Sequence, residues 1–225
     1  MKKITARNLI ILTVLILVVL GVGWFFVGTD DSDARERLAE LREEAREHRG
    51  YALRSAVPDE HRDDFSRCTE MTLYDAYAQR QPHELSSGEL EEALELANRC
   101  GSVYPDRRRF STEQTAQTVE EIREVLSELS SVSDEQTERY LGLWEELIDA
   151  LFDQSERFTR LSEIQRLFWE TEREFRSEDI ALEERNGRVS ELNREATEHS
   201  RVLRELGERI GGLSTEEEEL WQDLL

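Results

Sequence analysis

The chain has few of the residues that interrupt helices, with only three prolines in 225 residues. It also lacks any sustained alternation of β-branched and polar residues, which a half-buried strand would need. These absences exclude a β-rich fold. Glu, Arg, Leu and Ala dominate instead, and this composition is typical of long helices. The sequence therefore predicts an all-α fold.

Sequence motifs that carry chemistry are also missing. There is no glycine-rich phosphate loop, HExxH, GxSxG or CxxC. The four histidines (His48, His61, His83 and His199) are scattered, whereas a metal site needs ligands at close spacing. Carboxylates are so abundant that no pair stands out as an acid and base. We expect no catalytic, cofactor-binding or metal-binding residues, and no enzyme.

The chain contains few basic residues: it has 29 Lys and Arg and 51 Asp and Glu, which gives a formal net charge of −22. Every acidic residue lies after residue 28. A body this acidic repels nucleic acid and anionic lipid, which excludes both as partners of residues 29–225.

The one long hydrophobic run, residues 9–27, contains no charge and follows Lys2, Lys3 and Arg7. As a helix it would be roughly 29 Å long, about the thickness of a bilayer core. Cations before the run and acids after it predict a cytoplasmic N-terminus. The sequence thus predicts a single-pass anchor over residues 9–28 in a bacterial inner membrane, with most of the chain in the periplasm.

A cleavable signal peptide is the alternative for this run. Signal sequences have shorter apolar cores and end in small residues. Here the run ends in Trp24, Phe25 and Phe26, and Gly21 and Gly23 make a poor cleavage site. These features favour an uncleaved anchor.

Turn and capping signals divide the rest of the chain. Ser86-Ser87-Gly88-Glu89 and Ser133-x-x-Gln136 are capping boxes that predict helix starts. The predicted segments are a cytoplasmic tip (1–8), the anchor (9–28), a juxtamembrane helix (29–57), a helical hairpin (58–105), a second hairpin leading into a long coiled coil (111–213) and a C-terminal amphipathic peptide (214–225).

The only two cysteines, Cys68 and Cys100, lie on opposite sides of the predicted turn at Gln81-Pro82-His83. They are 15 and 17 residues from His83, so the hairpin would bring them to similar heights. In an oxidising compartment this predicts one disulfide. Closing that loop would contribute about 3–4 kcal/mol. Free buried thiols or an intermolecular bridge are the alternatives.

A heptad register with Tyr140 at its first a position and Leu143 at its first d position persists along the C-terminal half, with its a positions ending at Ile210. Its apolar face is broad before residue 170 and narrow after it. Asn186-Gly187 marks either a fold-back or a weak point in a continuous rod, and the unbroken register favours the rod. We expect the narrow face to bind another helix. This apolar seam consists of Leu182, Val189, Leu192, Leu203, Leu206 and Ile210.

Gly211-Gly212 predicts the end of the long helix and a hinge before the last residues. Leu220, Trp221 and Leu224 would then form an apolar patch that docks into a partner's groove. The favoured alternative is that the two glycines form a tight corner and the tail folds back to cap the protein's own bundle. The basic triplet Arg107-Arg108-Arg109 is expected in a loop, solvated or docked on an acidic surface.

A short cytoplasmic tip, one anchor and a long helical body resemble, in layout only, inner-membrane spanins of phage lysis and bitopic envelope or divisome scaffolds. We expect a membrane-anchored periplasmic scaffold or adaptor. It would self-associate or bind other helical envelope proteins. The alternatives are a sensory or ligand-binding module that works with a separate transducer, and a spanin-like lysis protein.

Overall fold

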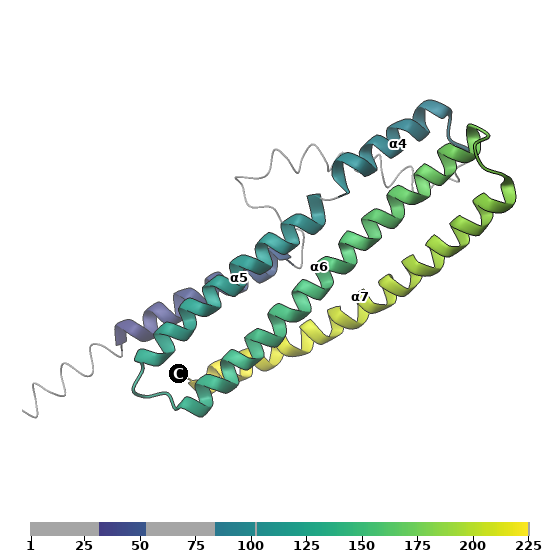
Figure 1. The fold of residues 1–225 in the computed structure, drawn as a ribbon. Helices are drawn as coiled ribbons and strands as arrows, with labels where there is room; N and C mark the ends of the chain where they lie inside the picture. Colours follow the sequence, from purple (N-terminus) through teal and green to yellow (C-terminus); the bar gives the residue numbers. More distant parts are fainter. Residues whose placement is uncertain (1–31, 53–83, 102, 225) are drawn as a thin grey trace, which may run out of the picture.

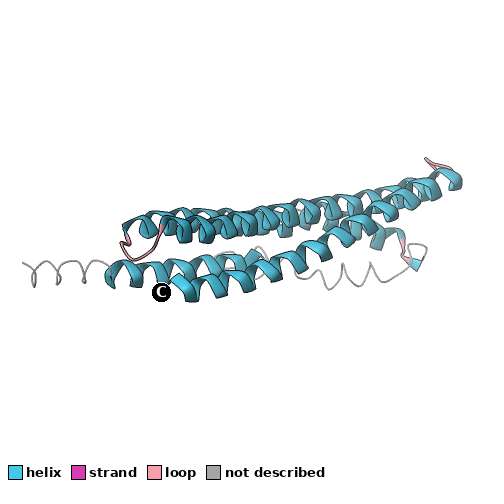
Figure 2. Cartoon of the chain, turned by 90° about the horizontal axis from the view of Figure 1, so that it is seen from below, coloured by secondary structure: helices cyan, strands magenta, loops and turns pink. Residues whose placement is uncertain are grey.

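The computed structural model describes residues 32–52, 84–101 and 103–224, and these residues are almost entirely helical (Figure 1). A first helix covers residues 32–52. It is followed by α4 (Ser87–Cys100), α5 (Val103–Glu128), α6 (Asp134–Arg176) and α7 (Leu182–Leu224). Within these ranges there is no strand, and short turns join α5 to α6 and α6 to α7 (Figure 2). The predicted all-α fold is confirmed.

Helices α5, α6 and α7 pack side by side in an elongated antiparallel bundle, with α4 continuing the line of α5 along α6 (Figure 1). Helix 32–52 runs antiparallel to α5. Its start lies near the α5–α6 turn, where Arg35 donates to Ser131, and its end contacts the start of α5, where Arg108 donates to the Ala52 carbonyl. The C-terminus lies at the same end as the start of helix 32–52 (Figure 1).

Both predicted capping boxes are confirmed. The Ser86 hydroxyl accepts from the Glu89 amide at the start of α4, and the Ser133 hydroxyl accepts from the Gln136 amide at the start of α6. In each case the side chain three residues on returns a hydrogen bond to the cap amide. α4 ends at Cys100 with Gly101 as its C-cap.

The main core lies in the half of the bundle that holds both helix 32–52 and the C-terminus. There, helix 32–52, the second half of α5, the first third of α6 and the last third of α7 bury Leu, Ile, Trp and Tyr side chains against one another. A smaller core joins α4 to Trp169 near the end of α6. We call the first region the proximal half and the second the distal half.

The predicted continuous rod is wrong. α6 ends at Arg176, the chain turns through residues 177–181, and α7 returns along α6. In the turn, Glu178 has a positive φ of 61°, and the Asp179 amide donates to the Glu174 carbonyl at 3.0 Å. Asn186 and Gly187, which offered the fold-back alternative, lie inside α7 and make no turn.

Two other predicted boundaries are wrong. α7 runs through Gly211 and Gly212 to Leu224, so there is no hinge before the last residues. The residues Arg107-Arg108-Arg109 belong to the first turns of α5, which begins at Val103 and not after residue 110. Pro105 is compatible with this earlier start, because a first-turn residue has no amide partner within the helix.

No helix among the described residues is both long enough and apolar enough to cross a membrane. The predicted anchor, residues 9–28, lies outside the described residues. So does Cys68, and nothing is described of the Cys100 side chain. The anchor and the disulfide therefore stay predictions.

Candidate functional site

The most distinctive polar site of the described chain is a buried ion pair between Arg42 of helix 32–52 and Glu217 of α7. Arg42 Nε donates to Glu217 Oε1 at 2.7 Å and Nη2 donates to Oε2 at 3.2 Å. The Glu217 side chain is 0% exposed. Two-point contact between a guanidinium and a carboxylate fixes both position and orientation. The pair therefore sets how the first and last described helices meet.

Two aromatic residues complete this site. The Tyr140 hydroxyl of α6 donates to Glu217 Oε1 at 2.9 Å, which satisfies a further lone pair of the buried carboxylate. The Arg42 guanidinium lies 4.5 Å from the ring centroid of Trp221, a distance typical of a cation–π contact. Burial, and then the negative charge of Glu217, raise the pKa of Tyr140, so its hydroxyl remains a donor at neutral pH.

Glu218 extends the cluster to the surface. Its Oε2 accepts from Arg42 Nη2 at 2.8 Å and lies 3.1 Å from Arg46 Nη1. Burial disfavours the charged form of Arg42, but its hydrogen bonds to Glu217 and Glu218 outweigh this and raise its pKa. The hydrogen bond from Arg42 lowers the pKa of Glu218. We call Arg42, Arg46, Tyr140, Glu217, Glu218 and Trp221 the proximal cluster.

A second polar contact joins three helices near the middle of the bundle. Arg108 Nη1 donates to the Ala52 carbonyl at 2.7 Å and to Gln154 Oε1 at 3.0 Å. The guanidinium also lies 4.1 Å from the ring centroid of Phe158. Gln154 is the only strongly polar residue at an a position of the predicted register, and its burial is explained by this contact. One arginine of the basic triplet thus points inward, and its neighbour Arg109 pairs with Glu113 on the same helix.

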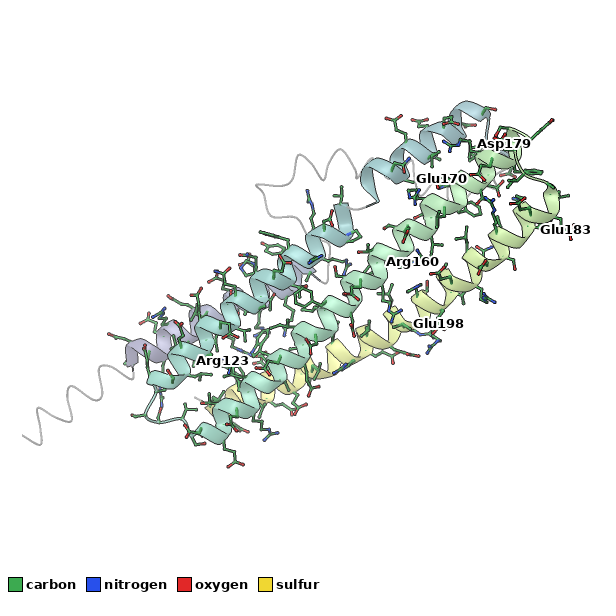
Figure 3. The ribbon with its side chains drawn as sticks, viewed as in Figure 1. Arg123, Arg160, Glu170, Asp179, Glu183 and Glu198 are labelled. Carbon is green, nitrogen blue, oxygen red and sulfur yellow. The ribbon has the colours of Figure 1, made fainter. Side chains whose placement is uncertain are left out.

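Ion pairs between α6 and α7 dominate the distal half. Arg160 projects from α6 toward α7 and binds both carboxylate oxygens of Glu195, at 2.5 and 3.0 Å (Figure 3). This contact is the main cause that raises the pKa of Arg160 and lowers that of Glu195. Arg188 pairs with Glu174 at 2.7 Å, and Arg185 pairs with the buried Glu172. Glu172 and Glu174, close to the turn, pair with the first part of α7, whereas Arg160, farther from the turn, pairs with Glu195; these pairs fix the antiparallel register.

His199 lies within this ion-paired region. Its Nδ1 is 3.3 Å from Arg157 Nη1 and its Nε2 is 3.6 Å from Glu195 Oε1. The histidine is therefore part of a polar contact between two helices of one chain. It belongs to no group of side chains that could hold a metal in the described ranges.

The apolar seam of α7 faces α6 of the same chain. Leu206 and Ile210 are buried in the proximal core, and Val189, Leu192 and Leu203 are half-buried along α7. Leu182, at the start of α7, is 57% exposed. The fold-back at residues 177–181 supplies the partner helix that the narrow seam was expected to find in another molecule. Leu182 is the one seam residue that is exposed.

The expected docking patch of the C-terminal peptide is also internal. Leu220, Trp221 and Leu224 are buried members of the proximal core. The prediction that they form a separate exposed patch is wrong, because α7 continues through Gly211 and Gly212 and holds them against the bundle. The fold-back alternative placed them correctly, although the helix needs no corner to do so.

The proximal cluster was not predicted, although the sequence contains a signal for it. The predicted a positions end at Ile210, but the next one in the same register is Glu217. A charged residue at a core position, followed by Leu220 at d and Leu224 at a, indicates a buried ion pair in a continuing helix. Comparison with known proteins adds no functional assignment: no family model, curated protein or solved structure matches this chain.

Proposed function

We propose that the chain is a membrane-anchored helical scaffold or adaptor of a bacterial envelope, and not an enzyme. The observation that carries this is topological: the described body begins and ends at one end of the bundle, and the apolar run precedes that end. An anchor over residues 9–28 would hold the proximal half next to the membrane. The 43-residue α6 would then carry the α6–α7 turn roughly 65 Å away from it.

Two features support an adaptor that acts through its distal end. The buried carboxylates that form ion pairs, Glu217 and Glu172, each contact an arginine of another helix, in the proximal cluster and in the ion-paired distal half. Leu182, the most exposed large apolar side chain described, lies beside the α6–α7 turn. A predicted disulfide between Cys68 and Cys100 would add a covalent constraint suited to the periplasm.

The orientation is tested by fusing alkaline phosphatase after residue 60. Active phosphatase is expected, because the charge distribution places that point outside the cytoplasm. Non-reducing mass spectrometry of the same preparation should recover a peptide that links Cys68 to Cys100. Phosphatase that is inactive in the fusion would overturn the periplasmic location, and two freely alkylated thiols would overturn the disulfide.

The adaptor role is tested by placing a photo-crosslinking amino acid at Leu182 in cells of the native host. A discrete adduct heavier than the monomer is expected in the membrane fraction. The matched control places the same amino acid at Ile122, which is 0% exposed and should give none. Absence of any adduct at Leu182 and at Phe110, the other large exposed apolar side chain, would contradict the proposal.

A ligand-binding module remains the second candidate, because of one specific observation. Arg49 is a buried cation without an ion-pair partner in the described part of the chain.

A further inference from the structure

Three arginines lie on one face of helix 32–52, because Arg42, Arg46 and Arg49 are spaced by four and three residues. The acids of α7 that pair with this face are Glu217 and Glu218. Glu217 is occupied by Arg42, and Glu218 is shared between Arg42 and Arg46. The three arginines of this face therefore outnumber the two carboxylates by one, and the excess charge belongs to Arg49.

Arg49 is only 9% exposed, and it makes no hydrogen bond or ion pair to the described residues. Its Nη1 is fully shielded from solvent without a partner. The guanidinium lies 5.5 Å from the ring centroid of Trp144, so an aromatic face supports it on one side. A charge removed from water without a partner is strongly destabilising, which makes this arrangement unusual in a folded core.

The surroundings of Arg49 contain too little negative charge to balance its guanidinium. Burial lowers the pKa of Arg49. The negative charge of Glu217 raises this pKa, and the positive charges of Arg46 and Arg42 lower it further. Two acids of the same helix are already engaged: Glu44 lies 3.5 Å from His48 Nε2, and Glu47 accepts from the Tyr51 hydroxyl at 2.6 Å. The position thus favours an additional anion despite the net charge of the whole chain.

We propose that Arg49 is the binding residue for a small carboxylate or similar oxyanion. A guanidinium offers two parallel N–H donors, which match the two oxygens of a carboxylate. The ligand must be small, because a side chain that is nine-tenths buried cannot be reached by the surface of another protein. This site is independent of the proposed adaptor role, since it lies in the proximal half and away from Leu182.

Thermal unfolding of the full chain in non-ionic detergent tests the site, with formate as the probe. Formate replaces chloride at constant ionic strength. The melting temperature should rise with formate and saturate, by roughly 3–6 °C at ten times the dissociation constant. Arg49→Met should abolish this rise. Without formate, Arg49→Met should melt higher than the wild type, because a buried unpaired charge has been removed.

Two variants sharpen the test. Arg49→Lys keeps the charge but loses the planar pair of donors, so formate should bind at least about tenfold more weakly. Arg139→Met is the matched control: its side chain is 65% exposed and lies 3.9 Å from Glu216. It removes one positive charge from the surface and should leave the formate response unchanged.

Three results would each overturn the proposal. Equal stabilisation by chloride and formate would show only screening of the net negative charge. A formate response that survives in Arg49→Met would place the anion elsewhere. A lower melting temperature for Arg49→Met in the absence of formate would show that a carboxylate of the chain itself already pairs with Arg49.

Discussion

Glu217 is the residue that contributes most to the relative arrangement of helix 32–52, α6 and α7. Its carboxylate accepts from Arg42 and from Tyr140 and has no contact with solvent. Buried ion pairs add little net stability compared with apolar residues of the same volume, but removing one partner leaves a costly charge. The pair therefore serves to specify one arrangement of the three helices.

This predicts an asymmetric pattern of stability. Glu217→Gln should lower the free energy of unfolding by about 3 kcal/mol, because Arg42 then keeps only its exposed partner Glu218. Replacing all three members together, with Arg42→Met, Glu217→Met and Tyr140→Phe, should recover most of that loss. Urea unfolding followed by circular dichroism measures both, with Glu219→Gln as the exposed control. If the free energy of unfolding of the triple variant falls as far as that of Glu217→Gln, the ion pair does not act mainly to specify the helix arrangement.

Glu218 makes a prediction about pH. Its pKa is lowered in the folded protein by the hydrogen bond from Arg42, so its contribution is fully present above the unfolded value, about 4.3. The contribution is lost as the pH falls through the folded value. Glu218→Gln should therefore melt below the wild type at pH 7, and the two curves should converge below about pH 4. Parallel curves down to pH 3 would rule out the linkage.

At the scale of the element, local signals located helix starts better than helix ends. Both capping boxes were predicted, because a Ser side chain and a Glu or Gln three residues later satisfy the same amides in any context. The fold-back was missed because residues 177–181 contain neither glycine nor proline. Glu178 nevertheless takes a left-handed conformation, with a φ of 61°. The heptad register could not reveal this turn, because it keeps its phase from Phe175 to Leu182.

The glycines of α7 led to the opposite error, because a helix end was predicted where the helix continues. Gly211-Gly212 is a typical helix end, but the apolar positions on both sides of it face the same core, and their burial overrides the low helix propensity. The predicted docking patch depended entirely on that hinge. The residues of the patch were identified as apolar and important, but their partner is the proximal core of the same chain.

The continuity of α7 predicts that its glycines can be replaced with a gain. A Cβ at Gly207, Gly211 or Gly212 would meet nothing within 4 Å. Each change to alanine should therefore raise the free energy of unfolding by about 0.5–1 kcal/mol. Gly101→Ala is the contrasting control, since its Cβ would lie 2.5 Å from the Ala97 carbonyl oxygen and should destabilise. Destabilisation by alanine at both Gly211 and Gly212 would argue for a turn there.

At the scale of the whole molecule, the bundle is held together differently in its two halves. The proximal half buries large apolar side chains from four helices. In the distal half the contacts between α6 and α7 are mainly ion pairs, and the apolar residues of α7 there are half-buried or exposed. Charge screening by added salt does not weaken apolar burial, whereas it weakens partly exposed ion pairs.

Hydrogen exchange should therefore show a gradient along α7. Amides of residues 206–221, packed in the proximal core, should exchange slowly, and those of residues 185–200 should exchange faster, because fewer buried apolar contacts oppose local opening. Raising sodium chloride from 0.1 to about 1 M shortens the screening length from about 10 Å to 3 Å and should speed exchange in residues 185–200 selectively. Uniform protection along α7, or a salt effect confined to residues 206–221, would contradict this division. The faster-exchanging half carries Leu182, so an adaptor that binds through its distal end would present its most adaptable segment to the partner.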